Sequence, residues 1–160
     1  MKHRPVLAVG LVLWSLLIGA GLQGCLSGEE PPTKPVRFEL RLADASMFPG
    51  AVQATVEGSG ETVYLSPEVV LTNAHVRRSG VQKTYSGDYG VELTLTEEGG
   101  EKLARLTREN LYKRVAILLD GRLVMAPRIQ TEIPGGVALI EGDFTKEKAG
   151  EIARGIQAGQ

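Results

Sequence analysis

Cysteine, histidine and tryptophan are nearly absent from this chain of 160 residues, which holds one Cys, two His and one Trp. The single cysteine, Cys25, has no partner for a disulfide within the chain. His75 is the only histidine beyond the third residue, so a transition-metal site would rest on carboxylates alone. The glycine pairs match no phosphate-binding loop. We therefore expect no metal and no cofactor.

A surplus of positive charge is also missing. The formal net charge is −1, and it becomes −3 if the first 24 residues, which carry Lys2 and Arg4, are removed. The basic residues form no run or patch of the kind that binds nucleic acid or anionic lipid. We therefore expect no nucleic-acid partner.

Long apolar runs are limited to the N-terminus, where an apolar stretch over residues 6–22 follows the positively charged residues 1–4. This stretch is shorter than the ~20 residues of a membrane-spanning helix and has the layout of a signal peptide, which we place at residues 1–24. Residues 25–35 are polar and rich in proline, which favours a flexible tether. Residues 36–159 are then long enough for one domain.

The signal ends in Leu22-Gln-Gly-Cys25, which resembles a bacterial lipobox. The resemblance implies that Cys25 becomes the mature N-terminus and is the site of lipid attachment. Two or three acyl chains hold a protein on a bilayer, whereas one chain binds only marginally. We expect a lipid-anchored protein of the cell envelope that faces the periplasm or the exterior, with the outer membrane favoured in a Gram-negative source because Leu26 follows the cysteine. The alternative is an uncleaved anchor in which Cys25 is incidental.

The last third of the chain has the clearest secondary-structure pattern. The apolar run 114–119 is followed by Asp120-Gly121 and a second run, 122–126, which predicts a β-hairpin with a tight turn. A third strand is expected over residues 137–140. Thr145 is the expected N-cap of a helix with a periodic apolar face, formed by Ala149, Ile152, Ala153 and Ile156.

Upstream, apolar alternation and turn residues predict further strands, over residues 36–42, 51–56, 62–65, 69–72 and 91–95. A brief helix is expected over 73–78. Thr96 is the expected N-cap of a longer helix that runs to about residue 110 and buries Leu103, Leu106 and Leu111. The fold class is α+β, with a mixed or antiparallel sheet and helices packed on one face.

Several short motifs in the second half resemble the head subdomain of the first periplasmic domain of SecD, a membrane subunit that assists protein export. The similarity is specific from about residue 88 to 159, and the motifs are Thr107-Arg-Glu-Asn110, Val115-Ala-Ile-Leu-Leu-Asp-Gly121, Ala126-Pro127 and Glu141-Gly-Asp-Phe-Thr145. The resemblance implies a SecD-head-like fold and a binding role toward extended polypeptide. It does not imply transport activity.

A second resemblance points to an enzyme. The segment Leu71-Thr-Asn-Ala-His75 is similar to the histidine region of trypsin-like (HtrA-type) serine peptidases, in which the histidine acts as general base. Such a site also needs an Asp and a Ser in a glycine-rich loop. The only serines after His75 are Ser79 and Ser86, and neither lies in such a loop. We predict that the chain is not an enzyme, has no catalytic residue, and places His75 on a short surface turn or helix.

Three functions from different classes follow from these patterns. The first is a protein-binding module for export or envelope maintenance, whose partner is a polypeptide chain or an envelope protein and whose membrane contact is made through the N-terminal lipid. The second is a structural envelope lipoprotein with an unrelated ligand. The third and least favoured is the peptidase.

Overall fold

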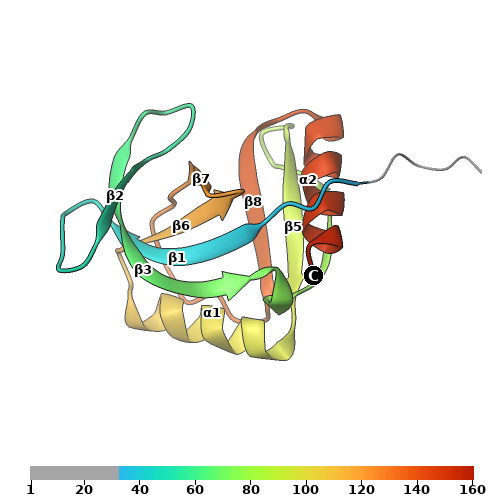
Figure 1. Cartoon of the computed structure of the whole chain (residues 1–160). Coiled ribbons are helices and arrows are strands. Elements are labelled where there is room, and N and C mark those ends of the chain that lie inside the picture. The colour runs from blue at the N-terminus through green and yellow to red at the C-terminus, as the bar shows by residue number, and fades with distance from the viewer. Residues whose placement is uncertain (1–32) are drawn as a thin grey trace, which may run out of the picture. The chain divides into compact units, whose positions relative to one another are not determined.

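Two antiparallel sheets and two helices make up the computed structural model, which describes residues 33–160 (Figure 1). This architecture confirms the predicted α+β class. In chain order the elements are β1 (Phe38–Asp44), β2 (Val52–Thr55), β3 (Thr62–Thr72), the 3-10 turn η1 (Asn73–His75), β4 (Val76–Lys83), β5 (Tyr89–Leu95), α1 (Glu97–Glu109), β6 (Arg114–Leu119), β7 (Arg122–Met125), β8 (Val137–Phe144) and α2 (Lys146–Ala158).

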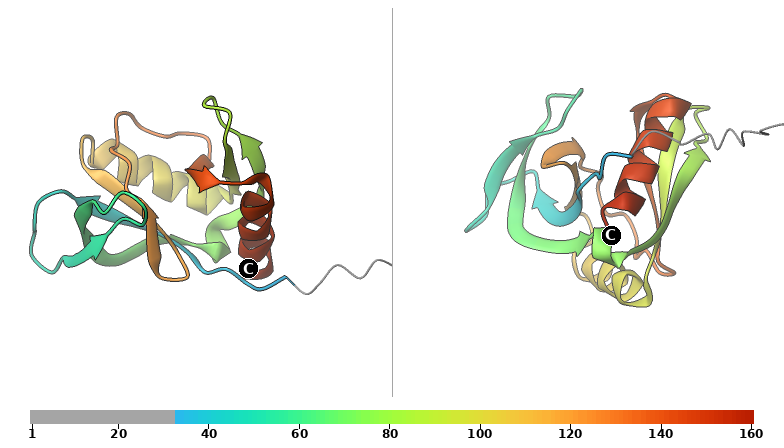
Figure 2. Two further views of the ribbon diagram at one scale, coloured as in Figure 1. Left: turned by 90° about the horizontal axis from the view of Figure 1, so that it is seen from above. Right: turned by 45° about the vertical axis from the view of Figure 1, so that its right-hand side comes forward.

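The strands are divided between a five-stranded sheet of order β2-β3-β1-β6-β7 and a three-stranded sheet of order β4-β5-β8. The chain passes from the first sheet to the second through η1, which joins β3 to β4. Helix α1 contacts β3 and β5, so it bridges the two sheets, and α2 lies along β4 and β5 (Figure 2). Both helices supply side chains to the same core cluster as the two sheets.

The hairpin of β6 and β7 confirms the turn prediction. Leu119 pairs with Arg122, and the two residues between them have positive φ values, 51° at Asp120 and 80° at Gly121. Two positive φ values are the requirement of a type I′ turn, which Asp-Gly meets at little cost. Asp120 also exchanges two hydrogen bonds with Arg37, since its Oδ1 accepts from the Arg37 N–H and its own N–H donates to the Arg37 carbonyl.

Both helix starts are confirmed as well. The Thr96 hydroxyl accepts a hydrogen bond from the Gly99 N–H at 3.1 Å, and the Thr145 hydroxyl accepts from the Lys148 N–H at 3.2 Å. Each bond satisfies one of the free N–H groups of a first helical turn. The predicted apolar face of α2 is buried throughout, and Leu103 of α1 is buried. The expected burial of Leu111 is wrong, because it follows the end of α1 and is 42% exposed.

The structure corrects the prediction between residues 62 and 83. Strand β3 is one continuous strand where two short ones were expected, and the predicted helix over 73–78 is wrong beyond His75. Val76 instead begins β4, a strand that the sequence did not indicate. Its pairing with β5 slips between Val76 and Arg78, and this irregularity interrupts the two-residue alternation by which a strand is recognised.

Candidate functional site

The peptidase-like segment forms the junction between β3 and β4, where His75 has a structural role. The imidazole Nδ1 accepts a hydrogen bond from the Thr72 N–H at 3.1 Å, and its Nε2 lies 2.8 Å from Lys102 Nζ and 3.8 Å from a Glu98 carboxylate oxygen. The His75 side chain is 16% exposed. Within residues 33–160, no hydrogen bond joins His75 to a serine or an aspartate. The hydroxyl of Ser79 donates to the Ala153 carbonyl instead.

The ion pair beside His75 perturbs one titration. Lys102 Nζ donates to a carboxylate oxygen of Glu98 at 2.7 Å, one helical turn away on α1. This hydrogen bond, together with the positive charge of the ammonium group, lowers the pKa of Glu98 below its ordinary value. The ion pair lies against the imidazole ring, since the ammonium group is within hydrogen-bond distance of His75 Nε2.

Asn73, in the same segment, joins three distant parts of the chain. Its amide oxygen accepts from the Phe38 N–H at 2.8 Å, and its amide nitrogen donates to the carbonyls of Val36 at 2.8 Å and Ile156 at 2.9 Å. Asn73 is buried, at 6% exposure. This set of bonds, which we call the Asn73 latch, ties the start of β1 to the last turn of α2. The Asn and His of the peptidase-like segment thus both serve the fold.

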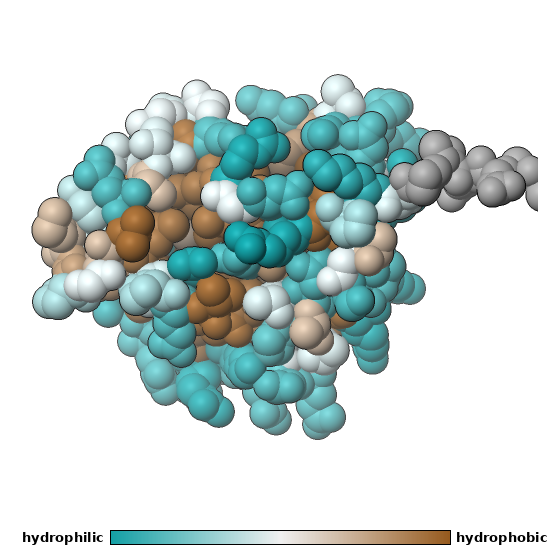
Figure 3. All heavy atoms as spheres, viewed as in Figure 1, coloured by the Kyte–Doolittle hydropathy of each residue, from teal (hydrophilic) through white to brown (hydrophobic). Residues whose placement is uncertain are grey.

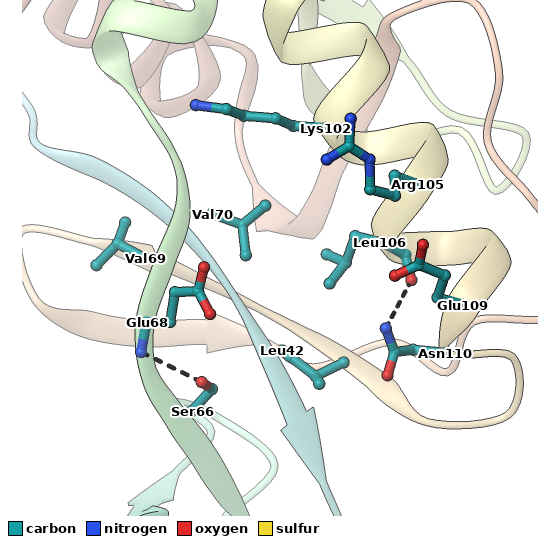
Figure 4. Close-up of a pocket in the computed structure, with 10 residues that line it drawn as sticks. All are labelled: Leu42, Ser66, Glu68, Val69, Val70, Lys102, Arg105, Leu106, Glu109 and Asn110. Carbon is teal, nitrogen blue, oxygen red and sulfur yellow. Dashed lines mark hydrogen bonds between the residues drawn. The ribbon is translucent and has the colours of Figure 1, made fainter.

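A groove lies between the second half of β3 and helix α1, with a cavity volume of about 370 Å³. Its apolar part is formed by Leu42 of β1, Val70 of β3 and Leu106 of α1, and Figure 4 shows Val70 and Leu106 pointing toward each other. Figure 3 shows apolar surface over β3 on this side of the domain, bordered by hydrophilic side chains. We call this feature the β3–α1 groove.

Basic and acidic side chains lie at opposite ends of the β3–α1 groove. Lys102 and Arg105 lie at the end near η1, whereas Glu109 and Asn110 lie at the other end (Figure 4). From β3, Glu68 directs its carboxylate toward the groove (Figure 4). One end of the groove is therefore basic and the other acidic, with an apolar centre.

The groove exists because β3 does not pair regularly with β1. Arg41 is paired with Val69 and Ala43 with Leu65, so three residues of β3 lie opposite one residue of β1, Leu42. Such a bulge bends the strand and interrupts the ladder. The helix supplies the opposite wall, because positions 102, 105, 106 and 109 fall on one face of α1. No sequence pattern predicted this site, although three successive apolar residues, Val69-Val70-Leu71, indicate a strand without alternation.

A second hollow, of about 500 Å³, lies over the other face of the five-stranded sheet. Its charged centre is Glu39 of β1, which is 6% exposed and lies between Arg41 of the same strand and Arg37, the residue before the strand. The carboxylate is 2.6 Å from Arg41 and 3.1 Å from Arg37. Burial of a carboxylate requires such partners, so these charges are already satisfied within the fold.

The remaining site predictions concern features that the structure does not test. Cys25, the predicted lipid-attachment residue, lies outside the described residues. Between residues 33 and 160 no group of three His, Cys, Asp or Glu side chains is placed to hold a metal ion. None of the helices in that range is long and apolar enough to cross a membrane.

The fold defines a small α+β domain made of two antiparallel sheets bridged by a helix. The family model described as the SecDF P1 head subdomain matches residues 49–160. The chain therefore belongs to the SecDF P1 head subdomain family. This match confirms the resemblance found in the sequence and extends it toward the N-terminus, from about residue 88 back to residue 49.

Individual relatives agree with this assignment. Protein translocase subunit SecD of Sebaldella termitidis is 41% identical over 90 residues, which are 56% of this chain and 22% of the relative. Protein translocase subunit SecDF of Thermus thermophilus is 49% identical over 69 residues, or 43% of this chain and 9% of the relative. The chain thus spans less than a quarter of the length of these two curated relatives.

Solved structures show the same fold. A crystal structure of SecDF in a super-membrane-facing form matches with a TM-score of 0.65 and 30% identity, covering 79% of this chain and 19% of that one. A structure of SecDF, described as a membrane component that enhances protein export, matches with a TM-score of 0.62 and 27% identity, covering 79% of this chain and 64% of that one. These relatives are protein translocation components, and the peptidase hypothesis gains no support from them.

Proposed function

We propose that this chain is an exported, lipid-anchored module that binds extended polypeptide during protein export or envelope maintenance, and that it is not an enzyme. The observation that carries the proposal is the β3–α1 groove, an open and mostly polar groove with an apolar centre, on a domain of the SecDF head family. An extended chain directs alternate side chains to one side, so apolar and charged residues of the ligand can reach the centre and the ends of such a groove.

The N-terminal sequence supports the location. A signal peptide over residues 1–24, lipid attachment at Cys25 and a tether over residues 25–35 would place the domain of residues 36–159 at the outer face of a bacterial membrane. Mass spectrometry of the purified mature protein tests this arrangement. The expected result is an N-terminal cysteine that carries acyl chains, and an intact N-terminus at Met1 would contradict it.

Site-specific photocrosslinking in cells tests the binding function. A photoreactive amino acid replaces Arg105, an exposed residue on the wall of the groove, and a matched probe replaces Gln82, an exposed residue of β4. We expect adducts with many newly exported chains at position 105 and few at position 82. Adducts with one envelope protein unrelated to export would favour the structural lipoprotein instead. Equal labelling at the two positions would contradict the proposal.

A further inference from the structure

In the part of the chain that the structure describes, one edge of strand β3 is unpaired beside the groove. Strand β2 pairs with β3 only from Thr62 to Leu65, whereas β1 pairs with β3 as far as Thr72. Among the described residues, no strand therefore pairs with the β2 side of β3 beyond Leu65. In an antiparallel strand, alternate residues direct their N–H and C=O groups away from the existing partner. The second half of β3 thus presents backbone groups that an added strand can bind.

Part of this edge is closed by local features. Pro67 has no N–H, and the Glu68 N–H is bonded to the Ser66 hydroxyl at 3.2 Å. At the other end, the Thr72 N–H is bonded to His75. The open part is therefore Val69–Leu71. It lies at the centre of the β3–α1 groove, beside the apolar wall that Leu106 supplies.

The charges at the groove ends are available to a ligand. Within residues 33–160, Glu68, Arg105 and Glu109 take part in none of the ion pairs. Arg105 lies near the η1 end of the groove, and the two carboxylates lie toward the other end (Figure 4). A bound chain of complementary charge therefore carries a carboxylate near Arg105 and an ammonium or guanidinium group near Glu68.

Resting on the proposed function, we infer that the groove binds extended polypeptide by strand addition, with the ligand antiparallel to β3 and its charges in a fixed order. An antiparallel strand runs from the Thr72 end toward Glu68. Its groove-facing residues, at positions i, i+2 and i+4, are then acidic, apolar and basic. Five residues of strand span about 17 Å, the same length as the segment from Glu68 to Thr72.

The test uses peptides of identical composition and opposite order. Both are eleven-residue peptides with a threonine background, one with the core Glu-Thr-Leu-Thr-Lys and one with Lys-Thr-Leu-Thr-Glu. They are titrated into the isotope-labelled full chain in detergent micelles, and binding is followed by NMR. We expect the first peptide to bind about threefold to tenfold more tightly, from two partly exposed ion pairs. The double variant Arg105→Glu, Glu68→Lys, which changes exposed residues only, is expected to reverse this preference.

A second comparison separates strand addition from simple docking of side chains. N-methylation of the alternate amides that face β3 is expected to weaken binding about tenfold or more, because two backbone hydrogen bonds are lost. Methylation of the other alternate amides is expected to leave binding within about twofold, since those N–H groups face away from β3. The bound peptide is also expected to slow hydrogen exchange at the outward-facing amides of Val69–Leu71.

The outcomes distinguish failure of strand addition from failure of the proposed function. If the peptide affinity depends neither on the position of the methyl groups nor on the order of the charges, strand addition is overturned. The proposal that polypeptide binds in the groove then still holds. Failure of both peptides to bind, together with no crosslinked chains at position 105, overturns strand addition and the proposed function alike. Crosslinked chains at position 105 without peptide binding overturn strand addition only.

Discussion

Replacement of Asn73 by alanine tests the Asn73 latch. The side chain makes three hydrogen bonds of 2.8 to 2.9 Å and is 6% exposed. An unpaired buried backbone group costs about 1–3 kcal/mol. The N–H of Phe38, a residue only 1% exposed, has no route to water, whereas the partly buried carbonyl of Val36 can be hydrated. We expect a loss of about 3 kcal/mol in the free energy of unfolding.

Urea unfolding followed by circular dichroism measures this loss, because the only tryptophan, Trp14, is not among the described residues. Asn110→Ala is the matched control. Asn110 also bonds a backbone carbonyl, that of Leu106 at 3.0 Å, but it is only partly buried at the end of α1. We expect the control to lose at most about 1 kcal/mol. Faster hydrogen exchange at Phe38 should accompany the loss in Asn73→Ala alone. Equal losses in the two variants would refute the reasoning.

Three further predictions concern backbone fit and charge. Gly155→Ala places a Cβ 2.9 Å from a backbone oxygen of the segment before β1 and should cost about 1–3 kcal/mol in unfolding free energy, whereas Gly80→Ala, in open space, should change it by at most about 0.5 kcal/mol. Because the pKa of Glu98 is lowered in the folded state, its contribution is present above the ordinary pKa and is lost as the pH falls through the lowered value. Urea midpoints of wild type and Glu98→Gln should therefore converge between pH 7 and pH 3, and a constant gap would argue against the ion pair. Tyr112→Asn should raise the melting temperature, because Tyr112 has φ 69° and asparagine tolerates that conformation better.

Local chemistry explains which parts of the fold were predictable. The Asp120-Gly121 turn and the caps Thr96 and Thr145 depend on residues within three positions of each other, so their signals are complete in the sequence. The Asn73 latch depends on Ile156, which is 83 residues away. No local pattern can reveal such a bond, and for this reason an Asn that serves the fold resembled part of a catalytic motif.

The candidate site was less predictable than the fold. The β3–α1 groove requires a slip in strand pairing opposite Leu42 and a helix wall that lies more than thirty residues further along the chain. The apolar run Val69–Leu71 carried a partial signal, since a strand with one solvent-facing side normally alternates. The sequence signal for strand β4 was weaker still, because its exposed residues are mostly polar and it has few apolar positions.

The Asn73 latch also holds the two ends of the domain side by side. Val36, near the first end of the domain, lies beside Gly159, near the other end. The Val36 N–H donates to the Gly155 carbonyl at 2.9 Å. A domain whose two ends lie close together can be inserted into a loop of another protein without separating the two ends of that loop. The same property allows the fold to form a small part of a much longer chain, as in the SecD and SecDF relatives, where the matched segments are 22% and 9% of the length.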